Sequence, residues 1–269
     1  MAEIDMNMSE FREELADALA EGGTRTLPRL TDEELAVLDP VTAEESIVSS
    51  PHLSALPPEQ QNLVMATALR SLVARGVVEI SNVQEMAAVL NGSHGSSLAQ
   101  VDMRIQFDVD LVLTLRRTAD RALALRQETA AGAAFAYAYI HTSHLLLLER
   151  VTTAGVHLFT LAGNIRDAAV LLCSFVDPFG VADRDGPEQR LGPSLDRDDI
   201  GPLAGIIDNA KIVTSLALLA DDPGPMMVAY GTDTAIWTVT VDRPQGPTGI
   251  RSQAVGRETL TRRLMDMLS

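Results

Sequence analysis

The sequence predicts an α+β protein: an N-terminal helical, winged-helix-like region, then two pseudo-symmetric antiparallel β-meanders that form a common sheet, each closed by a helix. The first observation behind this prediction is a weak repeat in the second half of the chain. Residues 155–161 (Gly-Val-His-Leu-Phe-Thr-Leu) align with residues 249–255 (Gly-Ile-Arg-Ser-Gln-Ala-Val), and a helical stretch follows each. Extended backwards, the alignment pairs Leu123-Ala-Leu with Leu216-Ala-Leu and Tyr139 with Tyr230.

Composition is the second observation. Hydrophobic residues make up 46% of the 269 residues but aromatics only 4%, so aliphatic side chains must fill the core, as in helices stacked on a sheet.

The chain carries a net charge of -16 and a single lysine, Lys211, which disfavours nucleic acid and anionic membranes as partners. No apolar run is long enough to cross a bilayer, and we expect a cytoplasmic protein. The only cysteine, Cys173, excludes an intrachain disulfide and is expected to be a buried thiol.

Composition shifts divide the chain into five segments. They are an acidic amphipathic segment (1–23), the winged-helix-like region (24–97), the first meander and helix (98–176), a linker rich in proline and glycine with a short helix (177–210), and the second meander and helix (211–269).

The winged-helix-like region contains clear helix signals. Thr31 and Glu34 form a capping-box pattern, and Pro40 stops the short helix that it begins. Pro57-Pro58 opens a longer helix that ends at Gly76. A strand over 77–80 and a helix over 83–90 follow, and 91–97 reads as a loop.

Alternating apolar residues predict the strands of both meanders. Residues 101–107 read as a strand, whereas 110–121 suit either a strand or a helix. Short turns between the later strands require antiparallel pairing. The predicted strands are 123–127, 135–140, 145–151 and 156–161 in the first meander and 212–219, 226–230, 236–241 and 250–255 in the second, with closing helices over 167–176 and 258–268.

Residues that could carry chemistry do not form a recognisable catalytic pattern. His141 and His144, with Glu149 or His157, could be drawn as a metal site, but the spacing crosses a predicted turn that fixes no ligand geometry. The carboxylate pairs Asp198-Asp199 and Asp221-Asp222 lie in turns, and Ser93-His94 lacks a nucleophile elbow. The sequence therefore predicts a protein that is not an enzyme, with no catalytic residue, metal or cofactor.

Residues 58–80 support an alternative function. An apolar helix with Arg70 and Arg75, ended by glycine and leading into a strand, looks like the recognition helix of a winged-helix transcription regulator that binds DNA. Residues 24–90, however, hold nine acids against four arginines, and a wing does not follow the strand. A structural or protein-binding use of this region is favoured.

The same stretch carries a family resemblance. The turn Ala74-Arg-Gly-Val-Val, the short helix over 83–90, the duplicated strands and the C-terminal helix together resemble the EspG family of type VII (ESX) secretion-associated proteins. The resemblance spans roughly residues 25–268 in order of elements, and only the Ala-Arg-Gly turn is motif-like. The family implies a cytosolic chaperone that clamps the apolar tip of a helical secretion substrate of the PE-PPE type.

A broad sheet built by duplication favours binding of a protein partner, and we expect the turns around two places to form the contact surface. These are His141 to His144 and the turn before Met226 and Met227. The two thioethers could adapt to an apolar client, or fill gaps in the core. The predicted partner-binding residues are therefore His141, His144, Met226 and Met227.

Overall fold

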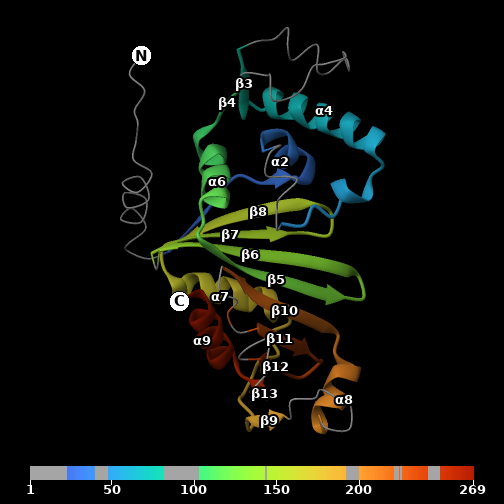
Figure 1. Cartoon of the computed structure of the whole chain (residues 1–269), viewed down its shortest axis with the longest axis vertical. Helices are drawn as coiled ribbons and strands as arrows, with labels where there is room; N and C mark the ends of the chain where they lie inside the picture. Colours follow the sequence, from blue (N-terminus) through green and yellow to red (C-terminus); the bar gives the residue numbers. More distant parts are fainter. Residues whose placement is uncertain are drawn as a thin grey trace. The chain divides into compact units, whose positions relative to one another are not determined.

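The computed structural model describes residues 23–39, 48–81, 103–142, 144–191, 200–220, 224, 226–241 and 249–269 (Figure 1). The predicted acidic helix before residue 23, the predicted helix over 83–90, the loop over 91–97 and the pairs Ser93-His94, Asp198-Asp199 and Asp221-Asp222 lie outside these residues. The chain forms two compact units. Of the described residues, those within 23–25, 119–149 and 160–269 form the sheet unit, and those within 26–118 and 150–159 form the helical unit.

The α+β class is confirmed, with a large antiparallel sheet in the strand order β1-β8-β7-β6-β5-β10-β11-β12-β13-β9. Its first half is β5 (Arg121–Thr129), β6 (Gly132–Thr142), β7 (Leu145–Val151), β8 (Val156–Ala162) and helix α7 (Ile165–Val176). Its second half is β10 (Ile212–Leu219), β11 (Met226–Gly231), β12 (Ile236–Val241), β13 (Ile250–Val255) and helix α9 (Arg257–Leu268). The edge strands are β1 (Thr24–Thr26) and β9 (Gln189–Leu191).

The two halves meet where β5 pairs antiparallel with β10, with Ala124 opposite Ala217 and Leu125 opposite Leu216. This register is compatible with a two-fold axis that relates Leu123 to Leu216, as the sequence repeat requires. In the next strands, Ala138 lies opposite Leu123 and Met227 lies opposite Leu216, so the two-fold axis would match Ala138 with Met227. At that spacing Tyr230 matches His141, whereas the sequence alignment matched it with Tyr139. The duplication stays a prediction, with this two-residue shift in its alignment.

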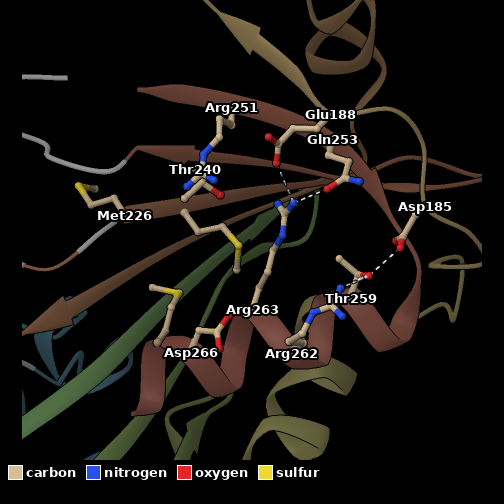
Figure 2. A pocket seen from close by; sticks show the side chains of 12 residues that line it. Asp185, Glu188, Met226, Thr240, Arg251, Gln253, Thr259, Arg262, Arg263 and Asp266 are labelled. Carbon is tan, nitrogen blue, oxygen red and sulfur yellow. Dashed lines mark hydrogen bonds and ion pairs between the residues drawn. The ribbon is translucent and has the colours of Figure 1, made fainter. Parts of the chain in front are cut away.

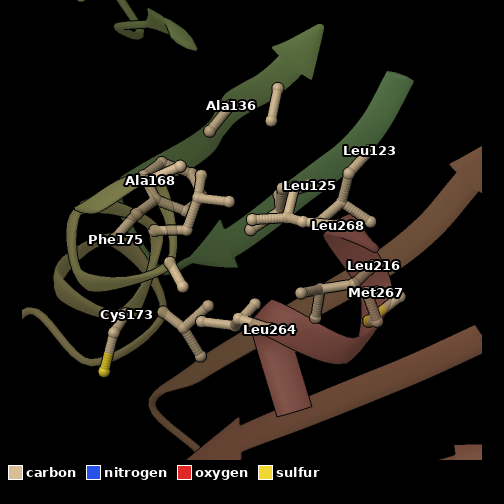
Figure 3. Close-up of a cluster of buried hydrophobic side chains, with 14 of the residues drawn as sticks. Leu123, Leu125, Ala136, Ala168, Cys173, Phe175, Leu216, Leu264, Met267 and Leu268 are labelled. Carbon is tan, nitrogen blue, oxygen red and sulfur yellow. The ribbon is translucent and has the colours of Figure 1, made fainter. Parts of the chain in front are cut away.

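The two closing helices bury side chains at matching positions. At one constant spacing, four of the six buried positions of α7 match buried positions of α9, namely Ala168 with Leu260, Leu172 with Leu264, Phe175 with Met267 and Val176 with Leu268. Figure 3 shows side chains from both helices meeting Leu123, Leu125 and Leu216 of the sheet. Each fully buried leucine contributes about 2 kcal/mol through removal of apolar surface from water. Cys173 lies in this core, as predicted, and burial raises the pKa of its thiol.

The other face of the second half is covered by α8 (Pro202–Asn209). Leu203 of this helix packs with Ile200, Val239 and Ile250 in a smaller apolar cluster. Alternation along the strands explains the division: Ile236 and Val255 enter the core beneath α9, whereas Val239 and Ile250 point the other way.

The helical unit begins with β2 (Leu30–Thr31) and α2 (Asp32–Leu38), and the predicted capping box is confirmed. The Thr31 hydroxyl accepts the Glu34 N–H at 3.3 Å, and the Glu34 carboxylate accepts the Thr31 N–H at 3.2 Å. The remaining elements are a 3₁₀ turn (Leu53–Ala55), α4 (Pro58–Ala74), β3 (Val78–Ile80), β4 (Met103–Ile105) and α6 (Phe107–Arg117).

Several predicted boundaries were wrong. The ambiguous stretch over 110–121 is helical up to Arg117, because its leucines and valines line one buried face of α6. The strand predicted over 101–107 covers only Met103–Ile105 among the described residues, and it pairs with β3, a partner that sequence reasoning did not identify. β6 continues through Thr142, so His141 lies in a strand and not in the turn.

The segment after α7 was predicted to be a surface linker, but its described part is held against the sheet unit. The Asp177 carboxylate accepts the N–H groups of Val181 and Ala182, both at 2.9 Å. Further along, β9 pairs with β13. The Asp177 contacts are local, but the pairing of β9 with β13 involves distant residues, which the local content of proline and glycine does not indicate.

Candidate functional site

A pocket of about 430 Å³ opens between α9 and strands β11 to β13 in the sheet unit (Figure 2). Its walls combine charged, polar and thioether side chains. The lining residues are Asp185, Glu188, Met226, Met227, Thr240, Arg251, Gln253, Thr259, Arg262, Arg263, Asp266 and Met267.

Strand alternation places polar side chains in this pocket. Thr238 and Thr240 of β12 lie on the same side as Ile236, and Arg251 and Gln253 of β13 on the same side as Val255. That side faces α9. On this side of the two strands, Ile236 and Val255 pack in the core, and Thr240, Arg251 and Gln253 line the pocket.

Arg263 is the central side chain of the pocket. Figure 2 shows it reaching from α9 towards the strands, where its guanidinium donates a hydrogen bond to Gln253 Oε1. A second hydrogen bond goes to Thr238 Oγ1. A Glu188 carboxylate oxygen lies 3.9 Å away. Burial lowers the pKa of Arg263, and the nearby charges of Arg251 and Arg262 lower it further, while Glu188 and Asp185 act in the opposite direction.

Asp185 holds the start of α9. The N-cap residue, Gly256, offers no capping side chain, and the Asp185 carboxylate accepts the Gly256 N–H at 2.8 Å and the Thr259 hydroxyl at 2.7 Å. The hydrogen bonds from Thr259 and Gly256 hold the pKa of Asp185 below its usual value. A carboxylate from a distant segment thus accepts the N–H of the N-cap residue, as the N3 carboxylate of a capping box does, and the Ala182 carbonyl accepts the Arg257 N–H at 3.0 Å.

We expect Asp185→Ala to lower the free energy of unfolding by about 1 to 2 kcal/mol, the usual cost of removing a helix cap. Asp183→Ala removes an exposed carboxylate two residues away and serves as the control, with an expected change within about 0.5 kcal/mol. Urea unfolding at pH 7 measures both. Equal effects of the two substitutions would contradict the capping role.

Arginines from three elements gather on this side of the sheet. Arg190 of β9 lies directly opposite Arg251 of β13 in the antiparallel register, so both side chains leave the same face. Arg262 and Arg263 come from α9, and the Arg262 guanidinium donates to Thr259 Oγ1 at 3.0 Å. We call Arg190, Arg251, Arg262 and Arg263 the arginine cluster. Three of its members, Arg251, Arg262 and Arg263, line the pocket together with the carboxylates of Asp185, Glu188 and Asp266.

The structure separates the four predicted partner-binding residues. Met226 and Met227 both line the pocket, together with Met267 of α9. Met227 is 2% exposed and packs in the core, whereas Met226 is 36% exposed. The core-filling role therefore fits Met227, and the partner-binding role fits Met226. His141 and His144 are not among the lining residues. His141 is half-buried in β6, and the N–H of His144 donates to Thr142 Oγ1 at 3.1 Å in the next turn.

The other histidine and acid candidates have structural partners. Glu149 is buried and accepts a hydrogen bond of 2.6 Å from the Tyr139 hydroxyl. In the helical unit, His157 Nε2 lies 2.7 Å from Asp32 Oδ1. Within the described residues, no group of three or more His, Cys, Asp and Glu side chains is placed to hold a metal ion. None of the helices in the described ranges combines the length and apolar character that a bilayer crossing requires.

Sequence reasoning found the methionines but missed the arginines and Asp185. The pair Arg262-Arg263 in an acidic chain was the available signal, because adjacent cations are uncommon here. Chemically, the pocket offers hydrogen-bond donors, cations and flexible apolar surface, which suit recognition of a polar group on an apolar stem.

Neither the protein-family models nor the curated proteins contain one that matches this chain.

Proposed function

We propose that the chain is a non-catalytic protein-binding adaptor or chaperone, and that the pocket beneath α9 is part of its contact surface for a helical polypeptide. The observation that carries this proposal is the pairing of exposed and buried methionines with arginines in one pocket. Thioether side chains adapt their shape to different apolar groups, and arginines are enriched in protein interfaces. The thioethers would contact apolar side chains of the partner, and the arginines its polar groups.

The order of elements that resembles the EspG family suggests a class of partner. On that resemblance, the partner would be a helical substrate of type VII secretion, escorted in the cytoplasm. The pocket supports the broader proposal of protein binding independently, because its chemistry does not depend on the family.

The alternative, a DNA-binding regulator that uses residues 58–80, draws less support from the structure. Arg75, at the end of α4, lies 2.5 Å from a Glu34 carboxylate oxygen, so one of the two arginines of this segment has an acidic partner. Leu69 and Leu72 of α4 are buried. DNA binding needs several cations free to meet phosphates, and this helix offers few.

A pull-down with the full chain as bait, followed by mass spectrometry, tests the proposal. We expect one helical protein at equal stoichiometry, and we expect Met226→Glu to weaken its binding about 10- to 100-fold, because a carboxylate would replace the exposed thioether. Leu171→Glu is the matched control: Leu171 is 39% exposed on α7, close to the 36% of Met226. A bait without a stoichiometric partner, or equal loss in both variants, would argue against the adaptor.

A further inference from the structure

We propose that the pocket recognises a carboxylate carried on an apolar stem, which comes from an acidic side chain or the C-terminal carboxyl group of a polypeptide and has an apolar neighbour. The inference rests on the proposed function, because it names the chemistry of the segment that the adaptor binds.

The first argument is the placement of like charges. Arg190 and Arg251 stand directly opposite each other on β9 and β13, an arrangement that destabilises a sheet. Arg262 and Arg263 bring two further guanidinium groups to the same side. A carboxylate that enters between these cations would offset part of their repulsion. The three lining arginines balance the three lining carboxylates, so an anion meets less repulsion here than a chain with a net charge of -16 offers on average.

The second argument is how Arg263 is held. Its hydrogen bonds go to two neutral groups, Thr238 Oγ1 and Gln253 Oε1, which fix the guanidinium without neutralising it. Arg263 also forms an ion pair with Glu188, but its Nη2 lies 3.9 Å from Glu188 Oε2, which is beyond hydrogen-bond distance. The Arg263 side chain is 20% exposed, so the positive charge remains accessible at the pocket wall. Preorganised guanidinium groups are well suited to carboxylates, which they bind through paired hydrogen bonds.

The third argument selects a carboxylate with an apolar stem over a phosphate. Glu188 and Asp266 line the same pocket and would repel a dianion more strongly than a monoanion. Met226 is the exposed thioether of the pocket, and it offers contact to the methylene groups or apolar neighbour of the bound carboxylate, with the buried Met227 and Met267 behind it. An acidic peptide residue flanked by an apolar residue fits both the arginines and the thioethers.

The test uses the full chain and an array of random twelve-residue peptides, each prepared with a free and with an amidated C-terminus. We expect the bound peptides to be enriched in Asp or Glu beside Leu, Met or Phe, or to require the free terminus. The two arms therefore distinguish an acidic side chain from a terminal carboxylate. Replacing the acid by its amide should weaken binding about 10- to 100-fold, the usual value of a charge-assisted hydrogen bond.

The protein variants are chosen to keep the fold intact. Arg190 and Arg262 are exposed, so the double variant Arg190→Gln/Arg262→Gln should fold as the parent and weaken binding of the acidic peptides about 10-fold. Arg251→Gln tests the half-buried position. Arg126→Gln removes an exposed arginine of β5, with a side chain 61% exposed, and should leave binding unchanged.

The outcomes separate this inference from the adaptor proposal. Selected peptides without acid enrichment, no peptide binding at all, or equal binding by the double variant and the parent would overturn the carboxylate site. A stoichiometric partner in the pull-down would still support the adaptor in those cases. Acid-dependent peptide binding with an empty pull-down would instead support the carboxylate site and remove the adaptor.

Discussion

Gly155→Ala should lower the free energy of unfolding by about 3 kcal/mol, from left-handed backbone strain and a steric clash together. Gly155 has a φ of +67°, which L side chains rarely adopt. A Cβ there would also stand 2.6 Å from the His52 Cβ and 2.8 Å from Asp32 Oδ2. The Gly155 carbonyl accepts the Asp32 N–H at 3.0 Å, so backing away from the clash would stretch this hydrogen bond.

Gly180→Ala is a matched control for this prediction. Gly180 has the same φ of +67°, and a Cβ there would meet no atom within 4 Å. Its substitution carries the backbone strain alone, about 1 to 2 kcal/mol. Urea unfolding of both variants yields the cost of the clash as the difference between them. Equal losses would mean that the contact of Gly155 with Asp32 and His52 does not constrain the helical unit.

The difference between these glycines illustrates what the sequence can and cannot predict. Gly155 was recognised at the start of a repeat, because turn chemistry is local. Its close approach to His52 depends on a residue about a hundred positions away, and no local pattern carries that information. The capping box of Thr31 and Glu34 and the strands of the meanders were predicted correctly. Both depend on residues only a few positions apart, a cap residue with its partner in one case and alternating apolar residues in the other.

The pocket could not be predicted because it is assembled from distant segments. Arg251 and Arg263 come from β13 and α9, and Glu188 lies in a segment whose prolines and glycines predicted a linker. Asp185, in the same segment, caps a helix that begins at Arg257. The methionines were identified from the turn that precedes Met226, which is a local signal.

Asp32→Asn should lower the free energy of unfolding at pH 7 by about 3 to 5 kcal/mol, the usual cost of breaking a buried ion pair or hydrogen-bonded network. The Asp32 side chain is fully buried. Its Oδ1 lies 2.7 Å from His157 Nε2, and its Oδ2 accepts the N–H groups of His52 at 2.7 Å and Leu53 at 3.0 Å. An asparagine keeps one oxygen for the two backbone N–H groups, but its NH₂ group cannot accept from a protonated His157 Nε2 and removes the negative charge beside this imidazole.

Glu33→Gln is the control for this substitution. Glu33 is the next residue in α2 and also pairs with a histidine, His52, at 2.6 Å, but the His52 side chain is 53% exposed. The Glu33 side chain is 12% exposed, but an ion pair with one solvent-exposed partner contributes little, so its removal should cost about 1 kcal/mol or less. Similar losses for the two variants would contradict a special role for the buried Asp32 network in the helical unit.

The Asp32 network should also make stability depend on pH. Burial alone raises the pKa of Asp32, but the hydrogen bonds from His157, Leu53 and His52 outweigh it and hold the pKa below its usual value. A carboxyl group with a lower pKa in the folded chain stabilises the fold above its unfolded pKa of about 4, and that contribution disappears as the pH falls through the folded pKa. Urea unfolding from pH 7 to pH 3 should therefore show the gap between parent and Asp32→Asn narrowing below pH about 4. A gap of constant size across that range would show that the charge of Asp32 does not stabilise the helical unit.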